Sequence, residues 1–337
     1  MILTRHSDAL TVSCPAKLNL FLETHGLRHD GYHEIETVMQ AITLYDQLRL
    51  ARPPDEAARP LGTSNSGTGI LPVSTTGQDH GQDARATPEP VSAHERLIFR
   101  CTDPALDNGQ NLASRAASLL LDMTGHPGGV VVTLDKSIPY GTGLGGASSD
   151  AAGVLVGLNQ LLQLGLSTAQ LTPLAAQLGS DVPFFLHGGT ALCTGRGEQV
   201  TPIHTQLVAH YVICCPPAPL STATVYKNLA GFGLTSGDRD ATFMTQALVR
   251  GDLSAVRSGL FNRLGRAAAQ LAPDVARTQE ILAEVSHRPA VVSGSGSAVY
   301  ALLDTAGEAA EVAREVGTRM AGQVFAAETE PAQPSLC

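Results

Sequence analysis

The chain has 337 residues, a length typical of two domains, and 43% of them are hydrophobic, enough for a sizeable core. Its formal net charge of −9 and its lack of tryptophan argue against a broad nucleic-acid-binding surface, although a local cationic pocket for a nucleotide stays open. No apolar run approaches the roughly 20 residues that span a bilayer, and residues 1–10 lack the apolar region of a signal peptide. We therefore expect a cytoplasmic protein that binds neither nucleic acid nor membrane.

Residues 11–23 alternate between apolar and polar side chains, with one apolar row running from Val12 to Leu22. A period of two predicts a half-buried strand. Lys17 and Asn19 fall side by side on the face opposite this row, and the spacing alone favours a solvated face for them. Residues 53–94 are rich in Pro, Gly, Ser, Thr and Ala and poor in large apolar side chains. They predict a disordered insert between two structured parts.

The rest of the chain alternates between patterns of period 3.6 and β-branched runs. Helices are expected over residues 111–123, from Ser148 or Ser149 to 162, and over 171–178, 261–285 and 308–320, and strands over residues 129–134, 208–215, 291–292 and 299–302. Because strands and helices alternate in both halves, the fold class is predicted to be α+β. The boundary between the halves is expected near residues 200–207.

A glycine-rich loop lies between the strand at 129–134 and the helix that follows it. It reads Pro139, Tyr140, Gly141, Thr142, Gly143, Leu144, Gly145, Gly146, Ala147, Ser148, Ser149. Glycines allow the backbone to approach a ligand closely, and Ser148 or Ser149 is a favoured N-cap for the helix. Because a helix N-terminus presents free N–H groups, the loop predicts a phosphate-binding site.

Three better-known phosphate loops fit less well. Gly141, Gly143 and Gly146 satisfy the dinucleotide pattern GxGxxG, but residues 161–170 contain no acidic residue for a ribose. Ala147 stands where a P-loop requires its lysine. The chain has no HRD or DFG triplet of a protein kinase.

The loop, together with the Asp-Ala-Ala that follows it, resembles the second motif of the GHMP kinases. The segment Pro15–Leu20 resembles the first motif of that family. Three further segments, Gly31–His33, Leu178–Phe184 and Ser293–Gly296, are similar, in the same order, to the branch that acts on a cytidyl diphosphate derivative of methylerythritol. This likeness covers nearly the whole chain except residues 53–94.

The resemblance implies an N-terminal domain like ribosomal protein S5 domain 2 over residues 1–205 and a ferredoxin-like C-terminal domain over 206–337. It also implies that ATP donates its γ-phosphoryl group to the 2-hydroxyl of the methylerythritol unit, in the non-mevalonate pathway of isoprenoid biosynthesis. Mg²⁺ is expected to neutralise the ATP phosphates. Its ligands are not fixed by the sequence, and Asp150 and Ser148 are candidates.

The same resemblance carries roles to individual residues. It implies that Asp181 is the general base and Lys17 its partner, which suits an alcohol that must lose its proton as it attacks phosphorus. The alternative for Asp181 is an N-cap or turn residue before Pro183. Implied ATP-binding residues are those of the loop, from Pro139 to Ser149, with Lys136, Asn111 and Leu112; implied substrate-binding residues are Asn19, Tyr32, His33, Thr222 and Tyr226.

Two alternatives stay open. One is a GHMP kinase that phosphorylates mevalonate, homoserine or a sugar, although Tyr32, His33 and Tyr226 fit an acceptor with a base to stack. The other is a non-catalytic nucleotide-binding protein on the same fold, against which Lys17 and Asp181 argue. Thr142 and Ala147 replace glycines of many relatives, and both are small enough for the loop to survive. The sequence carries no signal for an oligomeric state.

Overall fold

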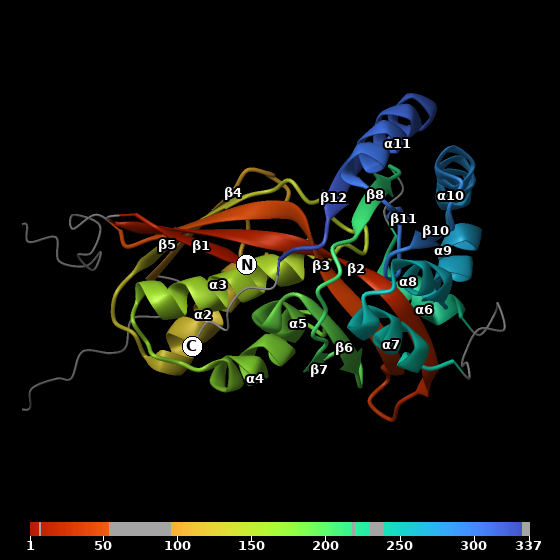
Figure 1. Cartoon of the computed structure of the whole chain (residues 1–337). Helices are drawn as coiled ribbons and strands as arrows, with labels where there is room; N and C mark the ends of the chain where they lie inside the picture. Colours follow the sequence, from red (N-terminus) through yellow and green to blue (C-terminus); the bar gives the residue numbers. More distant parts are fainter. Residues whose placement is uncertain (7, 54–95, 218–219, 230–238, 332–337) are drawn as a thin grey trace, which may run out of the picture.

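The computed structural model describes residues 1–6, 8–53, 96–217, 220–229 and 239–331. The predicted insert at 53–94 therefore lies, except for residue 53, outside the described residues. Strands and helices form two sheets with helices packed against them (Figure 1), so the predicted α+β class is confirmed. The predicted helices and strands are present with ends shifted by a few residues, with two corrections given below.

The first sheet is built around two long strands, which pair antiparallel along their length. Its members are β1 (Ile2–Arg5), β2 (Ala9–Leu27), β3 (His33–Ala51), β4 (Leu97–Cys101), β5 (Val130–Asp135), β6 (Thr190–Thr194), β7 (Gln199–Pro202) and β9 (Phe261–Asn262). The main order is β1-β2-β3-β5-β4, with β6 paired to β3, β7 to β6, and β9 to β2. The helices on one face of this sheet are α2 (Leu112–Thr124), α3 (Gly146–Leu161), α4 (Thr168–Leu178) and α5 (Val182–His187) (Figure 1).

The second sheet has the order β10-β11-β8-β12. Its strands are β8 (His210–Cys215), β10 (Ala290–Val292), β11 (Val299–Leu303) and β12 (Gln323–Glu328). The accompanying helices are α6 (Thr222–Asn228), α7 (Thr242–Arg250), α8 (Leu253–Gly259), α9 (Gly265–Leu271), α10 (Pro273–Ser286) and α11 (Ala306–Arg319).

The stretch over 261–285 is mostly helical, as predicted, but its start and its continuity need correction. Phe261 and Asn262 form β9, which pairs parallel with β2. The remaining helix is split, because Ala272 is extended, with φ −132° and ψ 100°, between α9 and α10. The cause is Pro273, since a proline disfavours the α conformation of the residue before it but suits the first turn of a helix.

The prediction of a half-buried strand at 11–23 was also wrong, because both faces of β2 are covered. Ala16, Leu18 and Leu20 pack in the core between the two sheets, whereas Val12 and Cys14 pack in the core beneath α3. A register shift between Pro15 and Ala16 separates the two groups. Irregularities of this kind re-aim the side chains that follow them. Here Lys17 lies against Gly145 of the glycine-rich loop, and Asn19 lies against Gly294.

Candidate active site

A cavity of about 1160 Å³ opens where β2, the glycine-rich loop, α6 and residues 294–295 meet. This volume lies slightly above the roughly 300–1,000 Å³ typical of small-ligand pockets. Among the described residues, four cationic side chains and one carboxylate line it: Lys17, Lys136, Arg196, Lys227 and Asp181. A cationic cavity in an acidic protein suits ligands that carry phosphates.

Lys17 and Asp181 form an ion pair on the wall of this cavity. Lys17 Nζ lies 3.6 Å from Asp181 Oδ2 and donates a 2.5 Å hydrogen bond to Asn19 Oδ1. The Lys17 side chain is only 3% exposed. Its burial lowers its pKa below the ordinary 10.5, and the neighbouring Asp181 opposes that shift. The ammonium of Lys17 is thus fixed in place and forms an ion pair with one carboxylate.

Two glycines make room for this lysine. A Cβ at Gly145 would lie 2.9 Å from Lys17 Cγ, and a Cβ at Gly294 would lie 3.2 Å from Lys17 Nζ. One glycine belongs to the glycine-rich loop and the other to the loop at residues 293–298. Both loops therefore close on the same side chain.

Asp181 holds the N-cap position of α5, as one alternative for this residue proposed. Within the described chain, however, its side chain makes no capping hydrogen bond to that helix. The carboxylate is 31% exposed and faces the cavity, where an incoming hydroxyl can reach it. Asp181 therefore marks the start of α5, but its carboxylate is not used to cap that helix and can contact a ligand in the cavity.

The glycine-rich loop adopts positive φ at Gly141 (72°), Gly143 (81°) and Gly145 (75°). The helix α3 begins at Gly146 with Gly145 as its N-cap, so the prediction of a cap at Ser148 or Ser149 was wrong. No side chain in the described chain caps α3. Its first N–H groups are therefore left for a ligand, as at anion-binding helix ends. Thr142 keeps a negative φ and donates from Oγ1 to Pro139 O at 2.8 Å, which is how the loop accommodates it.

A second loop, at 293–298, fastens the glycine-rich loop from the opposite side. Ala298 N donates to Thr142 O at 2.9 Å, and Ser293 Oγ donates to Gly143 O at 3.1 Å. A Cβ at Gly143 would lie 2.2 Å from Ser293 O. Only glycine fits this point of contact between the loops.

Aromatic side chains also line the cavity. The rings of His33 and Tyr226 lie 4.9 Å apart, and the Arg196 guanidinium lies 5.2 Å from the centre of the Tyr32 ring. Thr222 Oγ1 and Ser295 Oγ share a 2.8 Å hydrogen bond beside them. Burial lowers the pKa of His33 below its ordinary 6.5, so its imidazole is neutral at pH 7.

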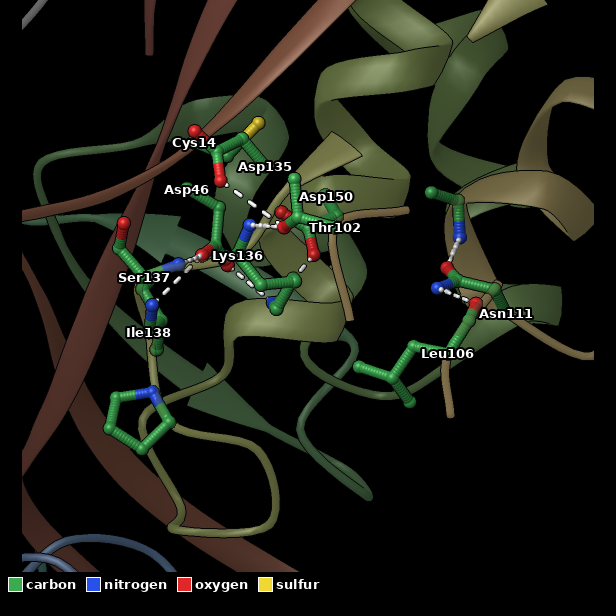
Figure 2. Close-up of polar contacts among 12 residues, drawn as sticks. Cys14, Asp46, Thr102, Leu106, Asn111, Asp135, Lys136, Ser137, Ile138 and Asp150 are labelled. Atoms are coloured by element: carbon green, nitrogen blue, oxygen red, sulfur yellow. Dashed lines mark hydrogen bonds and ion pairs between the residues drawn. The ribbon is translucent and has the colours of Figure 1, made fainter. Parts of the chain in front are cut away.

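The cavity brings together most of the residues singled out in the sequence. The lining residues among them are Lys17, Asn19, Tyr32, His33, Lys136, Pro139 to Ser148, Asp181, Thr222 and Tyr226. Asn111, Leu112 and Ser149 are not among the described residues that line it. Asn111 instead caps α2, with Oδ1 accepting from Ala113 N at 3.0 Å and Nδ2 donating to Leu106 O at 2.9 Å (Figure 2).

Two residues near the cavity carried no functional signal in the sequence. Arg196 lies between Gly195 and Gly197, and this glycine pair with positive φ was its one visible hint. Asp46 is a single acidic residue in the long strand β3, and its carboxylate pairs with Lys136 beneath the glycine-rich loop (Figure 2). Nothing local in the sequence marks Asp46, because its partners come from the segment that follows β5, far away in the sequence.

Asp150, a candidate magnesium ligand, belongs to the same buried cluster. It is 1% exposed, and its Oδ2 accepts from Lys136 Nζ at 2.9 Å. Burial raises the pKa of Asp150 to about 8, with Asp46 adding to the rise and Lys136 opposing it. This carboxyl group is not among the described residues that line the cavity, so it does not fit the role of a metal ligand there.

Comparison with known proteins gives the class to which this fold and site belong. The N-terminal domain model of the GHMP kinases matches residues 111–189, and their C-terminal model matches residues 244–322. The fold is thus the two-domain fold of GHMP kinases, which are small-molecule kinases. Solved structures of a homoserine kinase from Cytophaga hutchinsonii (15% identity, TM-score 0.67, 99% of this chain and 98% of that one) and of L. major mevalonate kinase (16%, 0.68, 98% of each) share the fold alone.

More similar relatives identify the branch. A 4-diphosphocytidyl-2-C-methyl-D-erythritol kinase from Symbiobacterium thermophilum is 36% identical over 295 residues, 87% of this chain and 90% of the relative. One from Mycolicibacterium vanbaalenii is 36% identical over 325 residues, 94% and 87% of the two chains. The crystal structure of a 4-(cytidine 5'-diphospho)-2C-methyl-D-erythritol kinase matches with 30% identity and a TM-score of 0.71, over 94% of this chain and 98% of that one. The chain belongs to the 4-diphosphocytidyl-2-C-methyl-D-erythritol kinase family.

Proposed function

We propose that this enzyme transfers the γ-phosphoryl group of ATP to the 2-hydroxyl of 4-(cytidine 5'-diphospho)-2-C-methyl-D-erythritol. The products are ADP and the 2-phosphate, a step of the non-mevalonate route to isoprenoids, for which the cytoplasm is the proposed location. The observation that carries the proposal is the ion pair of Lys17 and Asp181, held between a glycine-rich loop and an aromatic cluster in one cavity.

Asp181 is the proposed general base. Its carboxylate accepts the proton of the 2-hydroxyl as that oxygen forms a bond to the γ-phosphorus, while the bond from the γ-phosphorus to the bridging oxygen of ADP breaks. Lys17 is the proposed electrostatic partner. Its ammonium pairs with Asp181 and offsets negative charge on the transferring group.

The glycine-rich loop is the proposed phosphate cradle. The uncapped N-terminus of α3 and the backbone of Gly141 to Gly145 offer N–H groups to the phosphates of ATP. Mg²⁺ would arrive with ATP, bound to its phosphate oxygens. Ser148 lines the cavity and is the protein hydroxyl we propose as a ligand to that ion.

Tyr32, His33 and Tyr226 are the proposed binding site for the cytosine of the acceptor. Tyr32 and Tyr226 both line the cavity, and neutral His33 packs against Tyr226 with ring nitrogens that can donate or accept a hydrogen bond. Asn19 and Thr222 also line the cavity and are proposed to bind the acceptor as well. Mevalonate and homoserine have no nucleobase, so neither could stack on these aromatic side chains.

A side-by-side acceptor assay tests the proposal. Purified enzyme with MgATP is supplied with the cytidyl diphosphate substrate, mevalonate or homoserine, and ADP release is followed. We expect kcat/KM for the cytidyl substrate to exceed that for each of the others by at least a hundredfold. Equal or faster turnover of mevalonate would contradict the proposal that the cytidyl diphosphate compound is the acceptor.

A further inference from the structure

Three ionisable side chains meet beneath the two ends of the glycine-rich loop, outside the residues that perform the chemistry (Figure 2). Asp46 comes from β3, Lys136 from the segment that enters the loop, and Asp150 from the helix that leaves it. Lys136 Nζ donates to both carboxylates, to Asp46 Oδ2 and, at 2.9 Å, to Asp150 Oδ2. The Asp46 carboxylate is wholly buried and the Lys136 side chain is 9% exposed.

Asp46 also binds the backbone at the entrance of the loop. Its Oδ1 accepts hydrogen bonds from Ser137 N at 2.6 Å and from Ile138 N at 2.8 Å. Both oxygens of this one carboxylate are thus committed to three consecutive residues, 136–138. Hydrogen bonds to a buried charged group are among the stronger ones in proteins.

The exit of the loop packs against the same carboxylate. A Cβ at Gly146, the first residue of α3, would lie 3.1 Å from Asp46 Oδ2 and 3.0 Å from Ile138 Cγ2. The entrance and exit of the loop therefore touch at Asp46. The residues between them are left to form the phosphate cradle.

We propose that Asp46 is a positioning residue for the nucleotide: with Lys136 and Asp150 it forms a clamp that fixes both ends of the phosphate loop. The clamp acts on ATP through the loop, and it rests on the proposed function in that ATP is the ligand. In this clamp the ammonium of Lys136 binds Asp46 and Asp150 and so holds the loop. It does not bind a phosphate of ATP. Burial disfavours the charge on Lys136, but the two carboxylates raise its pKa, so it stays cationic.

The first test is the affinity for MgATP, measured by isothermal titration calorimetry. Asp46→Asn retains an oxygen for Ser137 and Ile138 but places an amide donor against the donor of Lys136. We expect the Kd for MgATP to rise about tenfold, while the KM of the acceptor changes less than twofold. Lys136→Met should weaken MgATP binding to a similar degree. The double variant should match Lys136→Met alone rather than show the product of the two effects, because both changes break one clamp.

The matched control is Glu23→Gln. Glu23 is also wholly buried, accepts from Arg263 Nε and Nη2 at 2.7 and 2.6 Å, and accepts from a backbone N–H, that of Thr24, at 2.8 Å. It lies on β2, away from the loop. We expect Glu23→Gln to lower the melting temperature as Asp46→Asn does, but to leave the Kd for MgATP within twofold of the wild type.

Three results would overturn the clamp: a Kd for MgATP within twofold of wild type in folded Asp46→Asn, an equal rise in Glu23→Gln, or multiplicative effects in the double variant. If Asp46→Asn does not fold, Asp150→Asn decides, with at least a threefold rise expected and an unchanged Kd against the clamp. Wild-type protein that does not bind MgATP would overturn the proposed function, and the clamp with it.

Discussion

Lys17 is a buried cation that pairs with Asp181 and donates a hydrogen bond to Asn19. The sequence placed Lys17 and Asn19 together through the period of a strand, and family resemblance supplied Asp181. Spacing alone pointed to solvent for both, because the register shift after Pro15 and the sheet that covers β2 are tertiary features. Asp46 shows the same limit, since its partners are brought together only by the fold.

The first prediction at this scale concerns the proposed base. Asp181→Asn removes the proton acceptor but keeps the size of the side chain, so we expect kcat to fall by at least a thousandfold. The Kd for MgATP should change less than threefold, because the phosphate loop is untouched. Kinetics and calorimetry on the same preparation measure both, and a variant that retains a tenth of wild-type kcat would remove Asp181 from the mechanism.

The second concerns the protonation of Lys17. Because burial lowers its pKa, the active, charged form should be lost as pH rises through a value below 10.5. A plot of log kcat/KM against pH should therefore bend downward on its alkaline side below pH 10.5. Lys17→Arg keeps its charge throughout this range. The residual activity of this variant should not decrease over the same alkaline range. If the decrease appears at the same pH as in the wild type, a group other than Lys17 causes it.

At the scale of elements, the glycine-rich loop and the helix α3 were predictable as a unit, but the start of the helix was not. A serine is the better N-cap on propensity, yet Gly145 takes that position because a side chain there would collide with Lys17. The uncapped helix end suits the proposed phosphate-binding role of the loop. A local preference was thus overridden by the needs of the site.

A pair of glycine substitutions tests this loop. Alanine at either Gly141 or Gly143 meets a positive φ, which costs about 1–2 kcal/mol. At Gly141 nothing lies within 4 Å of the added Cβ, whereas at Gly143 it lies 2.2 Å from Ser293 O. We expect Gly143→Ala to weaken MgATP binding at least tenfold more than Gly141→Ala. Equal effects in calorimetry would show that the contact between the two loops is unimportant.

At the scale of the whole molecule, the two sheets are joined by buried polar contacts as well as by apolar packing. Tyr300 OH donates to Asn19 O at 2.8 Å, and Tyr211 OH donates to Gln40 Oε1. We propose the domain boundary between residues 205 and 206, after β7 and before β8. The sequence predicted two halves but no such joint, because each tyrosine reads as an ordinary core residue of its strand.

These contacts predict a stability effect of defined size. Tyr300→Phe removes one buried hydrogen bond between the sheets and should lower the free energy of unfolding by about 1 kcal/mol. Tyr140→Phe is the matched control, since that side chain is 68% exposed and its loss of a hydroxyl should cost nothing measurable. Urea denaturation gives both values, and equal stability of the two variants would argue against the joint.

The chemical identity of the product is the most direct test of the proposed phosphoryl transfer to the 2-hydroxyl. The enzyme is incubated with MgATP and 4-(cytidine 5'-diphospho)-2-C-methyl-D-erythritol, and the mixture is followed by ³¹P NMR. We expect ADP and, in equal amount, a new phosphomonoester on the 2-hydroxyl, with neither product formed by Asp181→Asn. Release of inorganic phosphate in place of the ester, or an ester at another hydroxyl, would contradict this proposal.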